Sequence, residues 1–209
     1  MPLWTPDGKR AILQAAGGAS IISLPIESAQ PRQVLVKGPH ILQATSWSPD
    51  GTVLSMNELN PATGIDVVML SLQGDAKPMP FLNSNFNEKV AKFSADGHWI
   101  AYMSDESGRN EIYLTSFPDR STKQQVSTEG GNEPLWARSG RQLFYRNGDR
   151  MMVVDIVTSP QPAIGKPRVL FTGHYFSDIV HERTQYDVTP DGKRFLMFKA
   201  ANETLNRCS

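Results

Sequence analysis

The segment Trp47-Ser48-Pro49-Asp50-Gly51 decides the fold, because close copies of it recur along the whole sequence. The other copies begin at Trp4, Phe93, Trp136 and Val188 and end at Gly8, Gly97, Gly140 and Gly192. Successive glycines are therefore 43, 46, 43 and 52 residues apart. A period in this range predicts an architecture in which one small unit is repeated.

The residues between two copies follow a constant order of apolar runs and short polar turns. In the third repeat, the pattern predicts strands at 98–103, 111–116 and 124–127, with a turn at 105–110. The segment leading into each aromatic residue supplies a fourth strand. In the fourth repeat, the predicted strands 141–145 and 151–156 are joined through Asn147-Gly148, a dipeptide suited to tight hairpin turns. Each period thus predicts one four-stranded antiparallel blade.

Apolar residues fill successive positions in runs such as 65–70, as expected for a small sheet that is covered on both faces. The predicted fold class is therefore all-β, a partial β-propeller of about four to five four-stranded antiparallel blades. We expect the aromatic residues that open the copies to pack between blades, and these are Trp4, Trp47, Phe93 and Trp136. The Pro-Asp-Gly turns are interpreted as scaffold, because functional aspartates seldom recur at every equivalent turn.

These motifs resemble the TolB-type, WD40-like propeller repeat, whose hallmark is an aromatic-Ser-Pro-Asp-Gly turn followed by a strand like Ile-Ala-Tyr. The copy at 47–51 fits it fully, whereas Arg138 and Ser139 replace Pro and Asp in the fourth copy and Val188 replaces the aromatic residue in the fifth. Residues 186–197 resemble the closing repeat of propellers that follow bacterial serine/threonine kinase domains or winged-helix regulators. That resemblance implies an extracytoplasmic, periplasmic location for the intact protein.

The chain is short for a closed ring. Six or seven blades of this period need roughly 260–320 residues, and this chain has 209. We expect a propeller segment over 1–199, followed by a polar tail at 200–209. Its end blades would leave unpaired strand edges and an uncovered apolar face, so the isolated chain is expected to self-associate through open blade edges.

Composition excludes several classes of partner. Basic and acidic residues number 21 each, so nothing in the net charge favours binding to nucleic acid or to anionic lipid. No apolar run approaches the roughly 18 residues of a membrane span, and we expect no membrane contact from this chain. Cys208 is the only cysteine, so no intrachain disulfide is available.

The sequence contains no Gly-x-Ser-x-Gly elbow, Walker-type phosphate loop or His-Glu-x-x-His motif. We therefore predict no catalytic residue, no metal site and no cofactor. His98 directly follows a turn glycine and is interpreted as a surface or half-buried strand residue. The segment 174–183 holds His174 and His181 together with Asp178 and Glu182, but their spacing fits no common metal-ligand pattern, which favours a solvated loop.

Ligand binding is the stronger functional hypothesis. Innermost propeller strands line a central channel, and the residues that lead into them surround its mouth. The candidates are Lys89, Asn132, Glu133, His181, Glu182 and Arg183, and the alternative is that they are ordinary solvated loop residues. Together with the resemblance, this predicts a non-catalytic module for protein or small-ligand recognition, the C-terminal sensor-like part of a larger bacterial signalling protein. The alternative is the accessory propeller of a prolyl-oligopeptidase-like hydrolase whose catalytic domain lies outside this chain.

Overall fold

The structure is a computed structural model that describes residues 2–27, 30–74, 77–158, 162–176 and 183–199. These residues form nineteen β-strands and no helix. No element of the described chain has the helical length and apolarity required to span a membrane. The all-β class expected from the repeat is confirmed.

The strands form four complete sheets and one partial sheet, all antiparallel. The first sheet contains β1 (Leu3–Trp4), β2 (Arg10–Gln14), β3 (Ser20–Pro25) and β4 (Gln33–Lys37). The second contains β5 (Ile41–Trp47), β6 (Val53–Asn60), β7 (Gly64–Ser71) and β8 (Pro78–Leu82). The third contains β9 (Glu88–Phe93), β10 (Trp99–Ser104), β11 (Glu111–Ser116) and β12 (Lys123–Gln125).

The fourth sheet departs from the four-strand pattern at its outer side. It contains β13 (Asn132–Trp136), β14 (Gln142–Asn147) and β15 (Arg150–Val157), and both β16 (Ala163–Ile164) and β17 (Arg168–Thr172) pair with β15. The fifth sheet consists of β18 (Tyr186–Val188) and β19 (Phe195–Met197) alone. The chain therefore follows the predicted repeat as far as the second strand of the fifth unit.

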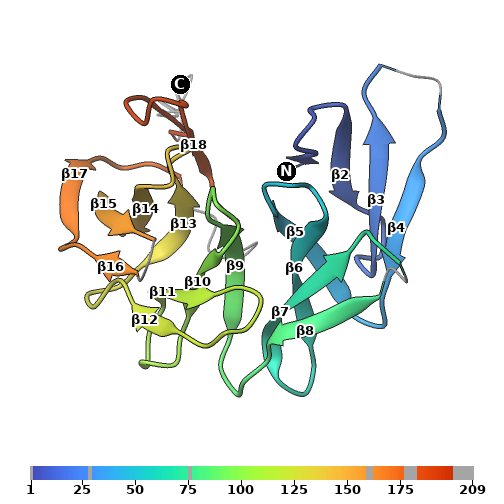
Figure 1. The fold of residues 1–209 in the computed structure, drawn as a ribbon, viewed down its shortest axis with the longest axis horizontal. Coiled ribbons are helices and arrows are strands. Elements are labelled where there is room, and N and C mark those ends of the chain that lie inside the picture. Colours follow the sequence, from blue (N-terminus) through green and yellow to red (C-terminus); the bar gives the residue numbers. More distant parts are fainter. Residues whose placement is uncertain (1, 28–29, 75–76, 159–161, 177–182, 200–209) are drawn as a thin grey trace, which may run out of the picture.

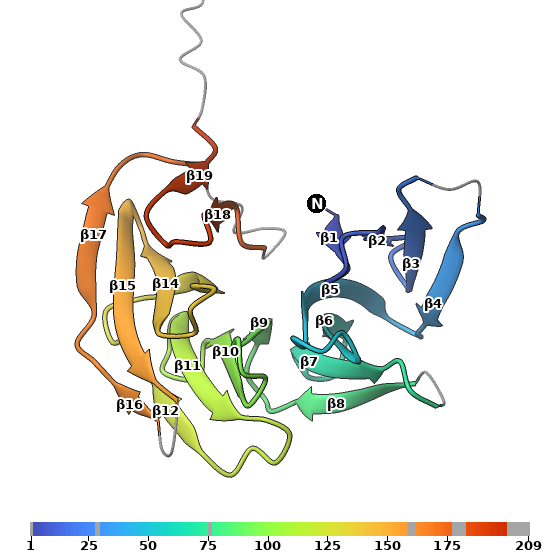
Figure 2. The ribbon, with the colours of Figure 1, turned by 45° about the horizontal axis from the view of Figure 1, so that its top comes forward.

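The sheets follow one another around an arc, with β1, β5, β9 and β18 toward its inner side (Figures 1 and 2). The first sheet and the β18–β19 pair face each other across the open part of the arc (Figure 2). One apolar cluster lies between each pair of neighbouring sheets, and the two middle clusters are centred on Phe93 and Trp136. Burial between blades, rather than within one sheet, is what stabilises this fold.

The aromatic position does not have the same environment in every repeat. Phe93 and Trp136 are each 7% exposed and pack against the preceding sheet, as predicted. Trp47 is partly buried in the cluster between the first two sheets. The expectation for Trp4 was wrong, because its side chain is 53% exposed. The face that packs on the preceding sheet in later repeats has no covering sheet at Trp4 in the described chain.

The repeated turns also contact one another between blades. An added Cβ at Gly51 would lie 3.4 Å from Cγ of Pro6, and one at Gly97 would lie 3.3 Å from Cδ of Pro49. At Gly140 the neighbouring atom is Cβ of Ala95, at 3.2 Å. The second, third and fourth turns therefore each contact the turn before them, and only a small residue or proline fits at this contact. The expected self-association through open edges stays a prediction.

Candidate functional site

The innermost strands of the second, third and fourth sheets each contain a bulge. Residues Val90 and Glu133, at equivalent places in β9 and β13, have φ values of 55° and 57°. The backbone amide of Val90 donates to Oδ1 of Asn57 at 2.9 Å, and that of Glu133 donates to Sδ of Met103 at 3.3 Å. In both cases the acceptor belongs to the second strand of the preceding sheet, so the bulge is held from the neighbouring blade.

Three of the predicted mouth residues lie at these bulges, namely Lys89 in β9 and Asn132 and Glu133 in β13. Lys89 and Glu133 are buried, whereas Asn132 and Arg183 are partly buried. Residues His181 and Glu182 lie outside the described residues.

Two of these side chains contribute to packing between neighbouring elements. Oδ1 of Asn132 accepts a hydrogen bond from the Asn110 amide at 3.1 Å. A carboxylate oxygen of Glu133 accepts the Gln185 backbone amide at 3.0 Å, which ties the fourth sheet to the segment entering β18. A ligand-binding role for the predicted set stays a prediction.

A second set of residues follows from the burial pattern of the innermost strands. The residue directly before each anchor position is partly or fully exposed, although its two neighbours in β9 and the preceding residue in β18 are buried. From the first sheet to the fifth, these residues are Leu3, Ser46, Lys92, Leu135 and Asp187. These five residues are here called the inner row. Leu3 and Leu135 also pack against the clusters between neighbouring sheets, and the Ser46 hydroxyl accepts the Phe93 amide at 3.2 Å, which leaves Lys92 and Asp187 as the charged members.

Lys92 is the chemically most distinctive member of the inner row. Its Nζ donates to the backbone carbonyl of Thr45 at 2.7 Å, so the side chain reaches from β9 to β5. Its own carbonyl accepts Nε1 of Trp136 at 3.1 Å, which holds its backbone from the next sheet. Burial lowers the pKa of the Lys92 amine to about 8, and the negative charge of Asp187 opposes this shift. The described residues supply one acceptor, which leaves donors of the ammonium group for a ligand.

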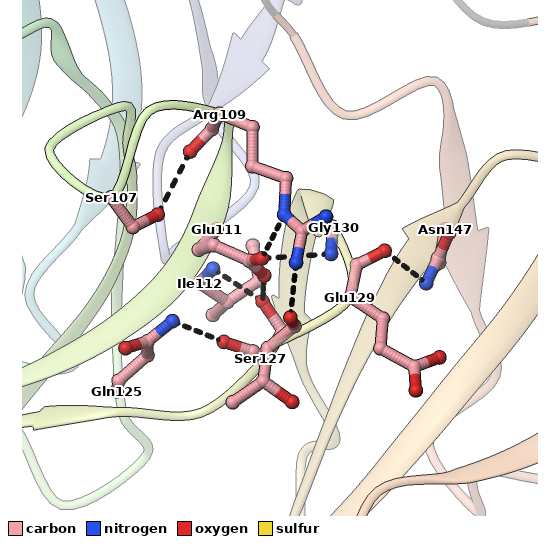
Figure 3. Close-up of polar contacts among 10 residues, drawn as sticks. Ser107, Arg109, Glu111, Ile112, Gln125, Ser127, Glu129, Gly130 and Asn147 are labelled. Atoms are coloured by element: carbon pink, nitrogen blue, oxygen red, sulfur yellow. Dashed lines mark hydrogen bonds and ion pairs between the residues drawn. The ribbon is translucent and has the colours of Figure 1, made fainter.

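The densest polar cluster surrounds Glu111, at the start of β11, and lies where the chain passes from the third sheet to the fourth (Figure 3). Its Oε1 accepts Nε of Arg109 and the Gly130 amide, both at 2.8 Å, and its Oε2 accepts the hydroxyl of Ser127. The same hydroxyl accepts the Ile112 amide at 2.8 Å. Because both carboxylate oxygens and the hydroxyl are engaged with the loop, the cluster clamps this connection rather than presenting a nucleophile.

The histidines do not form a site among the described residues. His98 is exposed, as expected, and Nδ1 of His174 lies 2.7 Å from a carboxylate oxygen of Asp149. In the part of the chain that is described, no three His, Cys, Asp or Glu side chains lie close enough to hold a metal ion.

A groove of about 1160 Å³ lies away from the predicted mouth, beside the third and fourth turns. Its lining includes Asp96, Arg141 and Asp155 together with the apolar Ile156 and Ile164. It borders the outer strand β16, so its location does not coincide with the inner row.

Comparison with solved structures connects this geometry to known folds. TolB from Acinetobacter baumannii superposes with a TM-score of 0.72 over 93% of this chain and 47% of its own, at 18% identity. This chain has the fold of a TolB-like β-propeller. A protein assigned as TolB in Agrobacterium tumefaciens gives a TM-score of 0.64 at 19% identity, covering 80% of this chain and 63% of its own.

The TolB-like fold is also shared with an enzyme. An oligogalacturonate lyase in complex with manganese matches with a TM-score of 0.69 at 13% identity, over 97% of this chain and 59% of its own. This chain therefore spans between about half and two thirds of the length of these neighbours. Comparisons of the sequence with protein-family models and with curated proteins find no match.

Proposed function

We propose that this TolB-like propeller is a non-catalytic recognition module that binds a protein or small ligand at the inner side of its arc. One observation carries the proposal. The inner row places one cation and one anion, Lys92 and Asp187, among apolar and hydroxyl side chains on neighbouring blades, while the surrounding strands are hydrogen bonded. Side chains presented by rigid strands need little reordering on binding, which favours specific recognition.

Lys92 and Asp187 are the polar members expected to orient a ligand. The Lys92 ammonium group offers donors to a carboxylate or carbonyl oxygen, and the exposed Asp187 carboxylate accepts from an amine or hydroxyl group. Leu3 and Leu135 are only partly buried by the clusters between sheets, and we expect their remaining exposed atoms to contact an apolar portion of the ligand. A ligand with both charges and an apolar portion, such as a short peptide, matches this row.

The test is a thermal-shift screen of the chain with free amino acids, short peptides and oligosaccharides. We expect a ligand that raises the Tm of the native chain and has no effect on Lys92→Ala or Asp187→Ala. Lys37→Ala, an exposed lysine on the outer strand β4, is the matched control and should respond like the native chain. Hydrolysis of a peptide or ester by the chain, lost on replacing one of its serines or histidines, would contradict a non-catalytic role.

The wider context of the module is part of the proposal. We place it as the sensor-like part of a larger bacterial signalling protein, in an extracytoplasmic location, because of the resemblance of residues 186–197 to kinase-linked propellers. The alternative is a propeller that accompanies a hydrolase domain. The reading frame that flanks this sequence distinguishes the two, since a kinase or winged helix supports the first and an α/β-hydrolase domain supports the second.

A further inference from the structure

Strand β19 has one unpaired edge. Among the residues that the structure describes, it pairs with β18 alone, whereas the second strand of each other sheet lies between two partners. The Thr189 amide donates to the Arg194 carbonyl at 2.9 Å, and backbone groups alternate along a strand. The backbone groups of Phe195 and Met197 therefore point to the edge where no strand lies in the described residues. This edge offers the hydrogen bonds of one further antiparallel strand.

The other sheets show what covers this edge. The position of Phe195 corresponds to Leu54, Ile100 and Leu143, and that of Met197 corresponds to Met56, Tyr102 and Tyr145. All six of those side chains are at most 2% exposed, because a third strand lies beside them. Phe195 and Met197 remain partly exposed, although they pack toward the same kind of cluster. Their environment is that of a blade lacking its third strand.

A groove lies directly beside the unpaired edge. It has a volume of about 580 Å³ and is lined by Leu170, Phe171 and Tyr175 on one side and by Lys193, Phe195 and Met197 on the other. The rings of Phe171 and Phe195, which both line the groove, meet edge to face with centroids 5.3 Å apart. In the third sheet, Tyr102 occupies the position of Met197, and it is paired with Tyr113 on the third strand. The Tyr113 side chain is buried against the preceding sheet. The groove therefore lies where the side chain opposite Met197 would pack.

The charges around β19 indicate the kind of strand that fits. Lys193, Arg194 and Lys199 are exposed on either side of the apolar segment. A second copy of β19 would bring the same cations to this edge, which disfavours pairing between two copies. A strand that carries a carboxylate near Lys199 is favoured. The third strand β7 has this pattern, because Asp66 precedes its apolar run.

We propose that β19 and the adjacent groove bind an extended peptide from a partner protein, which adds as an antiparallel strand. The peptide places an apolar side chain opposite Met197, in the groove, and an acidic side chain near Lys199. Main-chain hydrogen bonds supply affinity and the groove supplies specificity, as in other cases of strand addition to a sheet edge. This site is separate from the inner row.

The probe is a fluorescently labelled synthetic peptide with the sequence of residues 64–73. In the register of the complete sheets, placing its Val68 opposite Met197 brings its Asp66 opposite Lys199. Binding to the 209-residue chain is measured by fluorescence anisotropy, with the oligomeric state of the chain followed by sedimentation. A second peptide carries Asp66→Lys.

Two variants test the location of the site. Met197→Pro removes an N–H group from the free edge and should abolish binding. Leu170→Gln changes only an exposed groove residue, so it leaves the fold intact and should weaken binding by about tenfold. Met79→Gln, at an exposed position on the outer strand β8, is the matched control and should bind like the native chain.

Two results overturn the proposal. The first is that the peptide does not bind the native chain, or that it binds both Met197→Pro and Leu170→Gln as tightly as it binds the native chain. The second is a dimer of the native chain that dissociates in both variants, since this would assign the edge to a second copy. Equal binding of the Asp66→Lys peptide would contradict the assigned acidic contact.

Discussion

At the residue scale, the aspartates of the repeated turns bind the turns themselves. Asp7, Asp50 and Asp191 each accept the hydroxyl group two residues earlier and a backbone amide two residues later. The hydroxyl hydrogen bond is the main cause that lowers the pKa of each of these carboxyls. The scaffold role assigned to the motif thus follows from its own hydrogen bonds, and no ligand is required to explain it.

The first prediction at this scale separates backbone strain from contact between blades. Gly8 and Gly97 have φ values of 69° and 74°, but an added Cβ meets nothing within 4 Å at Gly8 and lies 3.3 Å from Pro49 at Gly97. Gly8→Ala should lower the free energy of unfolding by about 1 kcal/mol through backbone strain alone. Gly97→Ala should cost about 1 kcal/mol more. Urea denaturation measures both changes in the free energy of unfolding. Equal changes would show that contact between the turns does not contribute to stability.

The second prediction concerns Lys92 and pH. Its pKa is about 8 in the folded chain and near 10.5 when the chain is unfolded, so the folded state releases the proton first. The free energy of unfolding of the native chain therefore increases as the pH rises from the lower to the higher of these two pKa values. Lys92→Met should therefore stabilise the chain below pH 8, because it removes a buried charge. The expected gain is about 1 to 3 kcal/mol, reduced by the loss of the hydrogen bond to Thr45.

The gain from Lys92→Met should shrink as the pH approaches 10.5. Denaturation curves at pH 7 and at about pH 10 measure the change, with the exposed Lys37→Met as control. A stability difference that is independent of pH would show that the Lys92 amine is not desolvated in the folded chain.

At the scale of the strand, the bulges in β9 and β13 explain which side chains point away from the blade contacts. Each bulge inserts one residue opposite the second strand of its own sheet. The neighbouring blade accepts the displaced amide through Asn57 or Met103. The bulge therefore couples adjacent blades, and the position of Lys92 depends on it.

The prediction for this element compares two replacements of Asn57. Asn57→Leu removes the acceptor and leaves the buried Val90 amide unpaired, which should cost about 1 to 3 kcal/mol. Asn57→Met should cost less, because a methionine sulfur accepts the equivalent amide in the next sheet. Thermal or urea unfolding of both variants provides the measurement. A larger loss for Met than for Leu would contradict the role given to the acceptor.

The outer strands of the complete sheets carry features that hinder edge pairing. Strand β8 contains Pro78 and Pro80, and β12 contains Lys123 in a segment of three residues. Proline removes a donor and lysine charges the edge, so both discourage addition of a further strand. The inner part of β19 has neither feature within Phe195–Met197. This contrast is why the strand-addition site is assigned to β19.

At the scale of the whole molecule, the described part of the arc exposes an apolar residue on the outer face of each end sheet. Trp4 on the first sheet is 53% exposed, and Leu196 on the opposite face of the fifth sheet is 73% exposed. The residues equivalent to Leu196 include Ile12, Ala101 and Phe144, all at most 1% exposed between blades. In the other sheets, the corresponding face is therefore buried against a neighbouring blade.

The chain at high concentration should therefore associate through these faces, and Trp4→Lys and Leu196→Lys should reduce that association. Sedimentation velocity over a range of concentrations measures it, with Met197→Pro as a control that alters the strand edge. A single monomeric boundary with cooperative unfolding at all concentrations would contradict the expectation.

Most of the fold was predictable from the sequence, and the site was predictable only in part. The strand predicted at 111–116 coincides with β11, because local turn chemistry and apolar runs mark strand ends. The mouth residues were chosen by chain position, and Glu133 turned out to bind the neighbouring backbone. Lys92 was missed, although its place directly before an anchor residue was a usable signal.

The period, the strands and the turns could be predicted without a structure, since Pro-Asp-Gly chemistry and apolar runs act over a few neighbouring residues. Which of the equivalent positions are covered became known from the three-dimensional arrangement of the sheets. Trp4 and Trp136 occupy the same place in the repeat, yet one is exposed and the other is buried. The reason is physical: burial of a blade face depends on the adjacent blade, and the local sequence of one repeat does not contain that neighbour.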